Sequence, residues 1–432
     1  MMQRCIRAAI LHFPDSSKSA LDAQWQYLPD GLLWIADGRV KQLGSAEVLL
    51  AQLPPGTAVE HYPDHILIPG LIDMHVHYPQ LEMIAAYGTQ LLEWLNRYTF
   101  PVEQKYADKP YASRQAGAFL DQLLAQGTTT ALVFATSAVN SVDAFFEQAQ
   151  QRNLRMVSGK VLMDRHAPEA LCDTPERAYD ESAELIERWH GVGRLDYAVT
   201  PRFAPTSSEA QLLAAGQLLC DYPQTYLHTH VAENVDECAW VAELYPESRS
   251  YLDAYKQAGL VTDRAVFAHG IHLDTEDHQC LAQAGSTVCH CPSSNLFLGS
   301  GLFSINGALN AGVQVGVGTD VGGGTNLSML SALGDAYKVQ QMAGEGLTPQ
   351  QALYLATLGA ARALQLDAHI GNFEVGKEAD CVLLAPERIP QLKLRLEHPI
   401  EIDELIFALM ILGDERAVKQ TWVMGEPALS PE

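Results

Sequence analysis

The chain of 432 residues, 47% of them hydrophobic, is long enough for a large catalytic domain with an additional small domain. Its 52 acidic residues outnumber its 28 basic residues and give a net charge of −24, which disfavours binding to nucleic-acid polymers and anionic membranes. The sequence contains no run of about 18 apolar residues, no segment typical of a signal peptide and no CxxC pair among its eight cysteines. We therefore expect a cytoplasmic protein with reduced thiols and no membrane partner.

The pattern of apolar residues changes once near the start of the chain and once near its end. Residues 1–68 have the character of short strands, with a hairpin turn at Asp37-Gly38. Beyond them, apolar strands alternate with stretches of helical periodicity. The strands are predicted at 66–77, 128–135, 155–164, 195–202, 225–230, 265–269, 286–290 and 313–319. The helices between them are predicted at 112–126, 142–152, 174–189, 209–220, 235–244 and 275–284, and two more follow at 329–343 and 348–364. From Gly371 the sequence returns to β character.

Eight alternating strand and helix units predict an α/β fold with a (β/α)8 TIM barrel. We assign the barrel to residues 69–370. Residues 1–68 and 371–432 are predicted to form one small β-sandwich domain from both chain termini. In such a barrel the functional residues lie at the C-terminal ends of the strands.

The first predicted barrel strand ends in two histidines, within the motif PGLIDMHVH. Side chains two positions apart in a strand point to the same side, so His75 and His77 project together. Two imidazoles held in this way form half of a metal site. Taken alone, the pair fits two structural histidines equally well.

Polar residues at three other strand ends favour the metal site. His230 ends the fifth strand and Glu233 follows it, His269 ends the sixth in the motif AHG, and Asp320 follows the eighth in the motif GTD. Buried together without a metal, these groups would leave several donors and acceptors unpaired. A single ion is therefore predicted, zinc or alternatively iron, with four protein ligands. The predicted ligands are His75, His77, His230 and Asp320.

Two catalytic roles follow from this arrangement. Glu233 is placed to move a proton between the water that the metal activates and the substrate, although it could also be an exposed loop carboxylate. His269 is placed to stabilise the attacking oxygen. The tripeptide Cys289-His290-Cys291 looks like a ligand cluster, but we interpret it as the seventh strand and its loop.

The motifs PGLIDMHVH, HxxE, AHG and GTD resemble, in this order, those of the amidohydrolase superfamily. Members with two metals usually carry a lysine at the end of the fourth strand, where this chain has Thr200-Pro201-Arg202, which implies one metal. Finer motifs resemble the guanine deaminase family. They are HYPQ at 77–80, LLEWL and YTFP within 91–101, TPRF at 200–203, GTDV at 318–321 and GNFEVGK at 371–377.

The resemblance implies a homodimer that uses one zinc ion per subunit to hydrolyse guanine to xanthine and ammonia. It also implies that Asp320 takes part in proton exchange. The substrate-binding residues that it implies are Gln80, Arg202 and Phe203, with Trp94, Glu233 and His269 around them. A guanidinium at Arg202 suits the O6/N7 edge of guanine, whereas adenine presents a donor at position 6.

Three alternatives remain open. The aromatic segment 81–110 is either a lid over the substrate or a packing or subunit interface. Another amidohydrolase with one metal, acting on a cytosine, a triazine or a modified adenosine, would share the metal ligands but not HYPQ and TPRF together. A non-catalytic protein of this fold typically loses metal ligands, whereas every candidate is present in this chain.

Overall fold

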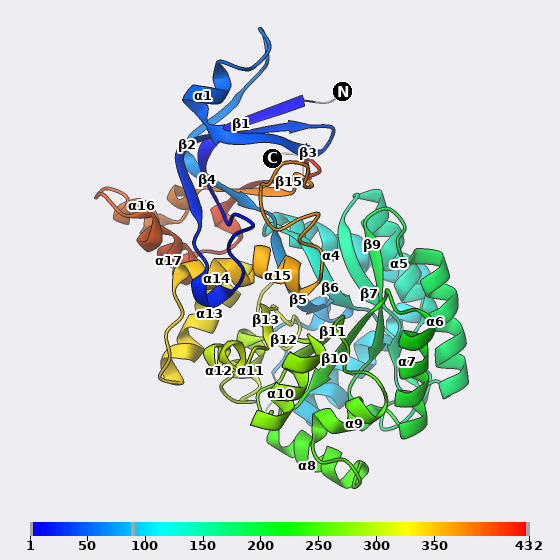
Figure 1. Ribbon diagram of the computed structural model, residues 1–432. Coiled ribbons are helices and arrows are strands. Elements are labelled where there is room, and N and C mark those ends of the chain that lie inside the picture. The colour runs from blue at the N-terminus through cyan, green and yellow to red at the C-terminus, as the bar shows by residue number, and fades with distance from the viewer. Residues whose placement is uncertain (1–2, 88–90, 429–432) are drawn as a thin grey trace.

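Eight β/α units form a parallel barrel in the computed structural model, which describes residues 3–87 and 91–428. Neighbouring barrel strands pair in parallel, and the last strand contacts the first (Figure 1). The barrel strands are β5 (Leu71–His77), β6 (Thr128–Phe134), β7 (Arg155–Gly159) with its extension β8 (Val161–Leu162), β9 (Leu195–Pro201), β10 (Tyr226–Val231), β11 (Ala265–His269), β12 (Thr287–His290) and β13 (Gln314–Val317). The predicted TIM barrel is therefore confirmed.

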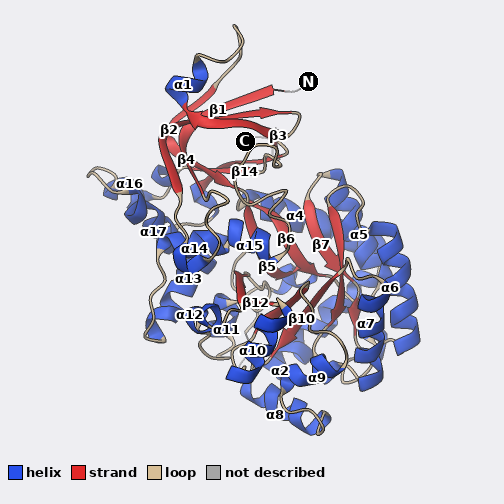
Figure 2. Ribbon diagram, viewed as in Figure 1, coloured by secondary structure: helices blue, strands red, loops and turns tan. Residues whose placement is uncertain are grey.

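Helices surround the strands on the outside of the barrel (Figure 2). The bounds of the predicted helices agree with the structure to within a few residues, except that the predicted helix 348–364 is divided in two. The short helices that begin at Leu91, Phe100, Tyr251, Pro292 and Ile305 were not predicted. The helices that follow barrel strands β5 to β12 are α2 (Leu91–Trp94), α3 (Phe100–Glu103), α4 (Lys109–Ala125), α5 (Val139–Gln151), α6 (Pro175–Trp189), α7 (Glu209–Asp221), α8 (Val235–Leu244), α9 (Tyr251–Gln257), α10 (Thr275–Ala284), α11 (Pro292–Phe297) and α12 (Ile305–Asn310). After β13 follow α13 (Met329–Met342), α14 (Pro349–Leu355) and α15 (Leu358–Ala363).

Both ends of the chain form a second, seven-stranded sheet, as expected for a β domain built from the two termini. Its strand order is β16-β15-β14-β4-β1-β2-β3, and register shifts interrupt several of its strand pairs. The strands are β1 (Gln3–His12), β2 (Gln26–Ala36), β3 (Arg39–Ser45), β4 (Glu60–Pro69), β14 (Cys381–Leu384), β15 (Val418–Val423) and β16 (Glu426–Pro427), and the short helix α1 (Ala46–Leu50) follows β3. The predicted domain limits of 1–68, 69–370 and 371–432 stay a prediction.

The sequence pattern did not predict two features of this region. The apolar run 66–77 looked like one strand, but the structure divides it at Gly70 between β4 of the terminal sheet and β5 of the barrel. A Cβ atom at Gly70 would collide with the side chain of Thr129, so the chain passes from one sheet to the other where it has no side chain. Helices α16 (Pro390–Arg395) and α17 (Ile402–Leu412) lie inside the C-terminal segment, and α17 packs against α13.

Apolar side chains fill the barrel below the strand ends. Ile72, Leu132, Val157 and Val266 are each at most 1% exposed and belong to one core cluster with residues of α15, which covers the opposite end of the barrel. Strands buried on both faces need such apolar runs. No helix among the described residues combines the length and the apolar character that crossing a membrane requires.

A buried ion-pair network joins the terminal domain to the barrel. Glu378, which lies before β14, accepts hydrogen bonds from Arg155 at 2.7 and 3.1 Å and from Arg194 at 3.0 Å. Arg194 also pairs with Asp380. Glu378 and both arginines are at most 7% exposed, so each charge depends on its partners.

We expect Glu378→Ala to lower the free energy of unfolding by about 3–5 kcal/mol, because it leaves two buried guanidinium groups without their shared carboxylate. Urea denaturation of the variant and the wild type measures the difference. Glu397→Ala, which removes an exposed carboxylate from the same terminal segment, serves as the control and should change little. Equal stability of the two variants would show that the network does not hold the domains together.

Candidate active site and metal centre

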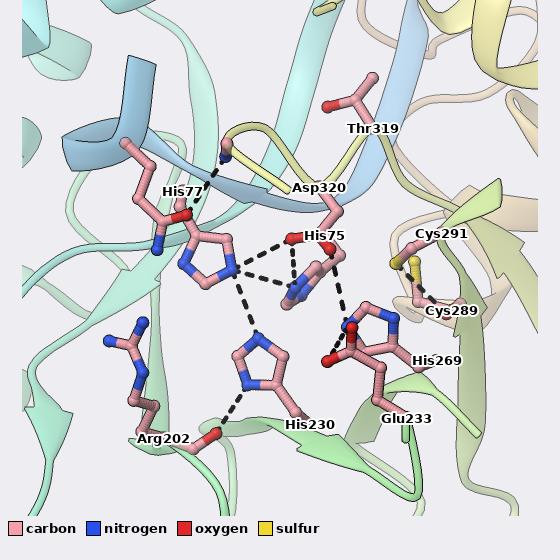
Figure 3. Close-up of polar contacts among 12 residues, drawn as sticks. His75, His77, Arg202, His230, Glu233, His269, Cys289, Cys291, Thr319 and Asp320 are labelled. Atoms are coloured by element: carbon pink, nitrogen blue, oxygen red, sulfur yellow. Dashed lines mark hydrogen bonds and ion pairs between the residues drawn. The ribbon is translucent and has the colours of Figure 1, made fainter. Parts of the chain in front are cut away.

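A cavity lined by polar and aromatic side chains opens at the C-terminal ends of the barrel strands. His75 lies directly beneath it, fully buried in the cluster of site side chains that Figure 3 shows converging. Every other residue that the sequence predicted for the site lines the cavity. These residues are His77, Gln80, Trp94, Arg202, Phe203, His230, Glu233, His269 and Asp320.

The four predicted metal ligands turn their donor atoms toward one point. The Nε2 atom of His77 lies 3.2 Å from Nε2 of His75, 3.3 Å from Nε2 of His230 and 3.2 Å from Oδ1 of Asp320. The Nε2 atom of His75 is likewise 3.2 Å from Asp320 Oδ1. Ligands bound tetrahedrally at zinc distances lie roughly 3.3 Å apart, so this donor set fits a metal ion.

The Nδ1 atoms of His230 and His75 have partners that fix which nitrogen faces the cluster, whereas Nδ1 of His77 is buried without a hydrogen-bond partner among the described residues. His230 donates from Nδ1 to the carbonyl oxygen of Arg202 at 2.6 Å, which leaves a bare lone pair on its Nε2 atom. His75 Nδ1 lies 2.7 Å from Nε2 of His228. Burial lowers the pKa of His77 to about 3 and holds the pKa of His230 well below its usual value, so both rings are neutral and able to bind a metal.

His269 also lies close to these donors. His75, His230, His269 and Asp320 form a group in which the ligand atoms are all within 4.8 Å of one another. His269 Nε2 is 3.6 Å from Asp320 Oδ2 and 3.4 Å from Glu233 Oε2, and its Nδ1 atom is held by Asn295 Oδ1 at 2.8 Å. It thus faces both carboxylates from the side opposite His77.

Glu233 is buried at the cavity wall, which excludes the alternative of an exposed loop carboxylate. Its Oε1 atom accepts a hydrogen bond from Ser300 at 3.2 Å. Burial, assisted by the negative charge of Asp320, raises the pKa of Glu233 to about 8. Burial acts in the same direction on Asp320, but the imidazoles that face it hold its pKa well below its usual range. Two neighbouring carboxylates with opposite pKa shifts are typical of acid–base sites.

The other wall of the cavity carries the predicted substrate residues. Gln80 and Arg202 are 2% and 3% exposed, and both contact the carboxylate of Glu103. Phe203 and Trp94 add apolar surface, and Trp94 donates from Nε1 to the carbonyl oxygen of Ala86 at 3.1 Å. The part of segment 81–110 that carries Trp94 therefore closes one side of the cavity.

Sequence reasoning missed several residues that support the site. No sequence motif marked Glu103 as a site residue, because it does not follow a barrel strand. A motif did mark His228, since it precedes His230 by two positions and repeats the HxH spacing of the first strand. Cys289 and Cys291 are fully buried in the barrel core, which confirms their interpretation as part of the seventh strand and its loop.

The contacts of His77 and His269 predict different effects on metal content. We expect His77→Ala to lose most of the bound metal, because its Nε2 atom is 3.2–3.3 Å from three other donors. His269→Ala should retain the metal. Elemental analysis of the purified variants measures this, with His398→Ala, which removes an exposed histidine, as the control. Equal metal loss in the first two variants would make His269 a ligand.

Comparison with known proteins identifies the family. The model of the amidohydrolase family matches residues 66–428. Guanine deaminase from Escherichia coli (strain K12) is 49% identical over 412 residues, which are 95% of this chain and 93% of that protein. The solved structure of E. coli guanine deaminase superposes with a TM-score of 0.95 at 44% identity and covers all of both chains. A guanine deaminase structure from C. acetobutylicum, with guanine bound in its active site, has a TM-score of 0.88 at 26% identity and covers 99% of this chain and 100% of that one. The chain therefore belongs to the amidohydrolase family and, within it, to the guanine deaminases.

Proposed function

We propose that this protein is an enzyme that hydrolyses guanine at C2 to xanthine and ammonia. The observation that carries the proposal is the shared cavity. One wall holds the buried donor cluster and Glu233, and the other holds Gln80, Arg202 and Phe203. The chain that carries this arrangement is itself 49% identical to the guanine deaminase of E. coli, which supports the same function.

The metal in this proposal is one zinc ion per subunit. Three imidazoles and a carboxylate are ligands that zinc accepts, and iron is the alternative. When bound, a divalent metal activates water at neutral pH and favours the ionised form of Glu233 through its positive charge. His75, His77, His230 and Asp320 would hold it.

Arg202 and Gln80 orient the base. The guanidinium of Arg202 donates to O6 and N7 of guanine, and the amide of Gln80 contacts the remaining polar edge of the ring. Phe203 and Trp94 bound the apolar part of the cavity and keep water from it. This orientation turns C2 toward Glu233 and the ligand cluster.

Glu233 carries the proton through the reaction. It takes a proton from the attacking water and gives it to a ring nitrogen next to C2 while the C2–O bond forms. Asp320 accepts the second proton of the water from the hydroxyl on C2, and this proton passes through Glu233 to the amino group. The C2–N bond then breaks and ammonia leaves. His269, 3.4 Å from Glu233, faces the oxygen on C2 in the tetrahedral intermediate, and it donates to this oxygen from Nε2 in its doubly protonated form, because its Nδ1 atom already donates to Asn295 Oδ1.

The homodimer and the cytoplasmic location that the resemblance implies belong to the same proposal. Light scattering of the purified protein checks the first, and cell fractionation checks the second.

An ammonia-release assay on the zinc-loaded protein tests the function. Guanine should give equimolar xanthine and ammonia. Release from cytosine, a triazine or a modified adenosine without release from guanine would contradict the proposal and favour another activity of the amidohydrolase family.

Glu233→Gln should retain its metal and lose turnover by about 10²-fold or more, because the amide cannot carry the proton. Steady-state kinetics on guanine and elemental analysis measure the two effects. Glu243→Gln, an exposed change on α8, is the matched control. Near-normal turnover in Glu233→Gln would remove Glu233 from the proton transfer.

A further inference from the structure

Glu103 is a buried carboxylate that lies behind the cavity wall. It is 1% exposed and does not line the cavity itself. Its Oε1 atom accepts hydrogen bonds from Nε2 of Gln80 at 3.1 Å and from Nη1 of Arg202 at 3.0 Å, and its Oε2 atom accepts from the same Nη1 at 2.8 Å. One side chain therefore holds both of the residues that we assign to reading the base.

Helix α3 supplies a second contact to the same guanidinium. Phe100 lies three positions before Glu103, so the two side chains are neighbours on one helix face. The guanidinium carbon of Arg202 lies 5.4 Å from the centre of the Phe100 ring. Since Arg202 is 3% exposed, its charge needs the Glu103 carboxylate as a counter-charge. The ion pair with Glu103 uses Nη1 of Arg202 and leaves Nη2 and Nε available for other acceptors.

Glu103 also determines which way the amide of Gln80 faces. A carboxylate only accepts, so the group that Gln80 turns toward Glu103 is its NH2. The amide oxygen then accepts from the backbone N–H of Gly322 at 3.2 Å. Without the carboxylate, this side of the amide loses its acceptor, and only the N–H of Gly322 still favours the orientation.

We propose that Glu103 is a positioning residue that makes the site specific for a purine with an oxygen, rather than an amino group, at position 6. The inference rests on the proposed function. Glu103 fixes the free donors of Arg202 where the 6-oxygen lies and prevents the guanidinium from turning away. A base with an amino group at that position then places donor against donor, which leaves buried polar groups unpaired.

The purine 2,6-diaminopurine tests this inference, because it keeps the 2-amino group of guanine and carries an amino group in place of O6, with an unprotonated N1 in place of N1–H. The measured quantity is the ratio of kcat/KM for guanine to kcat/KM for 2,6-diaminopurine, with ammonia release and chromatography of the product as readouts. We expect Glu103→Gln to lower this ratio by about tenfold or more, since sites that require a hydrogen bond discriminate by about 10⁴ or more. Bound metal should stay at the wild-type level.

Two further variants separate positioning from general support of the fold. Glu103→Asp keeps the charge and should restore part of the ratio. If Glu103→Gln does not fold, Glu103→Asp replaces it as the variant in which the ratio is measured. Glu82→Gln removes an exposed carboxylate of the same segment, which contacts Tyr111 at 2.6 Å and Lys105 at 3.3 Å, and should leave the ratio unchanged.

The outcomes distinguish this inference from the proposed function. A wild type that releases no ammonia from guanine contradicts the function itself, and this inference with it. A wild type that is active on guanine, with a Glu103 variant whose kcat/KM falls equally for both bases, overturns the positioning role alone and makes Glu103 structural. A fall in Tm without a change in the ratio leads to the same conclusion.

Discussion

The proposed metal ligands His75, His77 and Asp320 are placed by the seam where the first and last barrel strands meet. The backbone N–H of Asp320 donates to the carbonyl oxygen of His75 at 2.8 Å, and the N–H of His77 donates to the residue that follows Asp320, also at 2.8 Å. Asp73, which is fully buried, secures the same turn by accepting hydrogen bonds from the N–H and the hydroxyl of Thr319. One strand brings two imidazoles and the other brings the carboxylate. Closing the barrel therefore brings together three of the four proposed ligands, and β10 supplies the fourth, His230.

Buried charge is the second constraint on the site. Burial raises the pKa of Asp73 to about 6, and burial with the charge of Asp320 raises that of Glu233 to about 8, so each ionised carboxylate here has a large desolvation cost. For Glu103, the ion pair with Arg202 offsets the desolvation cost. Asp320 and Glu233 share this buried space. A divalent cation held between them would supply positive charge to both carboxylates, which is a physical reason to propose a metal at this site.

The sequence predicted the features that depend on periodicity and on strand ends. Eight strands, the HxH pair and Asp320 all follow from alternation and from the known position of barrel active sites. Gly70 was not predicted as a break, because the reason for it is the side chain of Thr129, far along the chain. The role of Glu103 depends on where α3 packs, which no local pattern encodes. His269 and Asp320 have φ angles of 71° and 50°, a strained region for residues other than glycine that only the folded structure shows.

Arg202 joins the two halves of the site through different parts of one residue. Its carbonyl oxygen accepts the Nδ1 proton of His230 and so directs the other nitrogen of that ring toward the metal position. Its guanidinium, held by Glu103, lines the cavity. Because the carbonyl oxygen belongs to the backbone, a change of the Arg202 side chain leaves this contact with His230 in place. The Thr200-Pro201-Arg202-Phe203 motif therefore matters as a length of backbone as well as a set of side chains, because it passes the end of β9 and places the carbonyl oxygen of Arg202 against His230 and its side chain at the cavity.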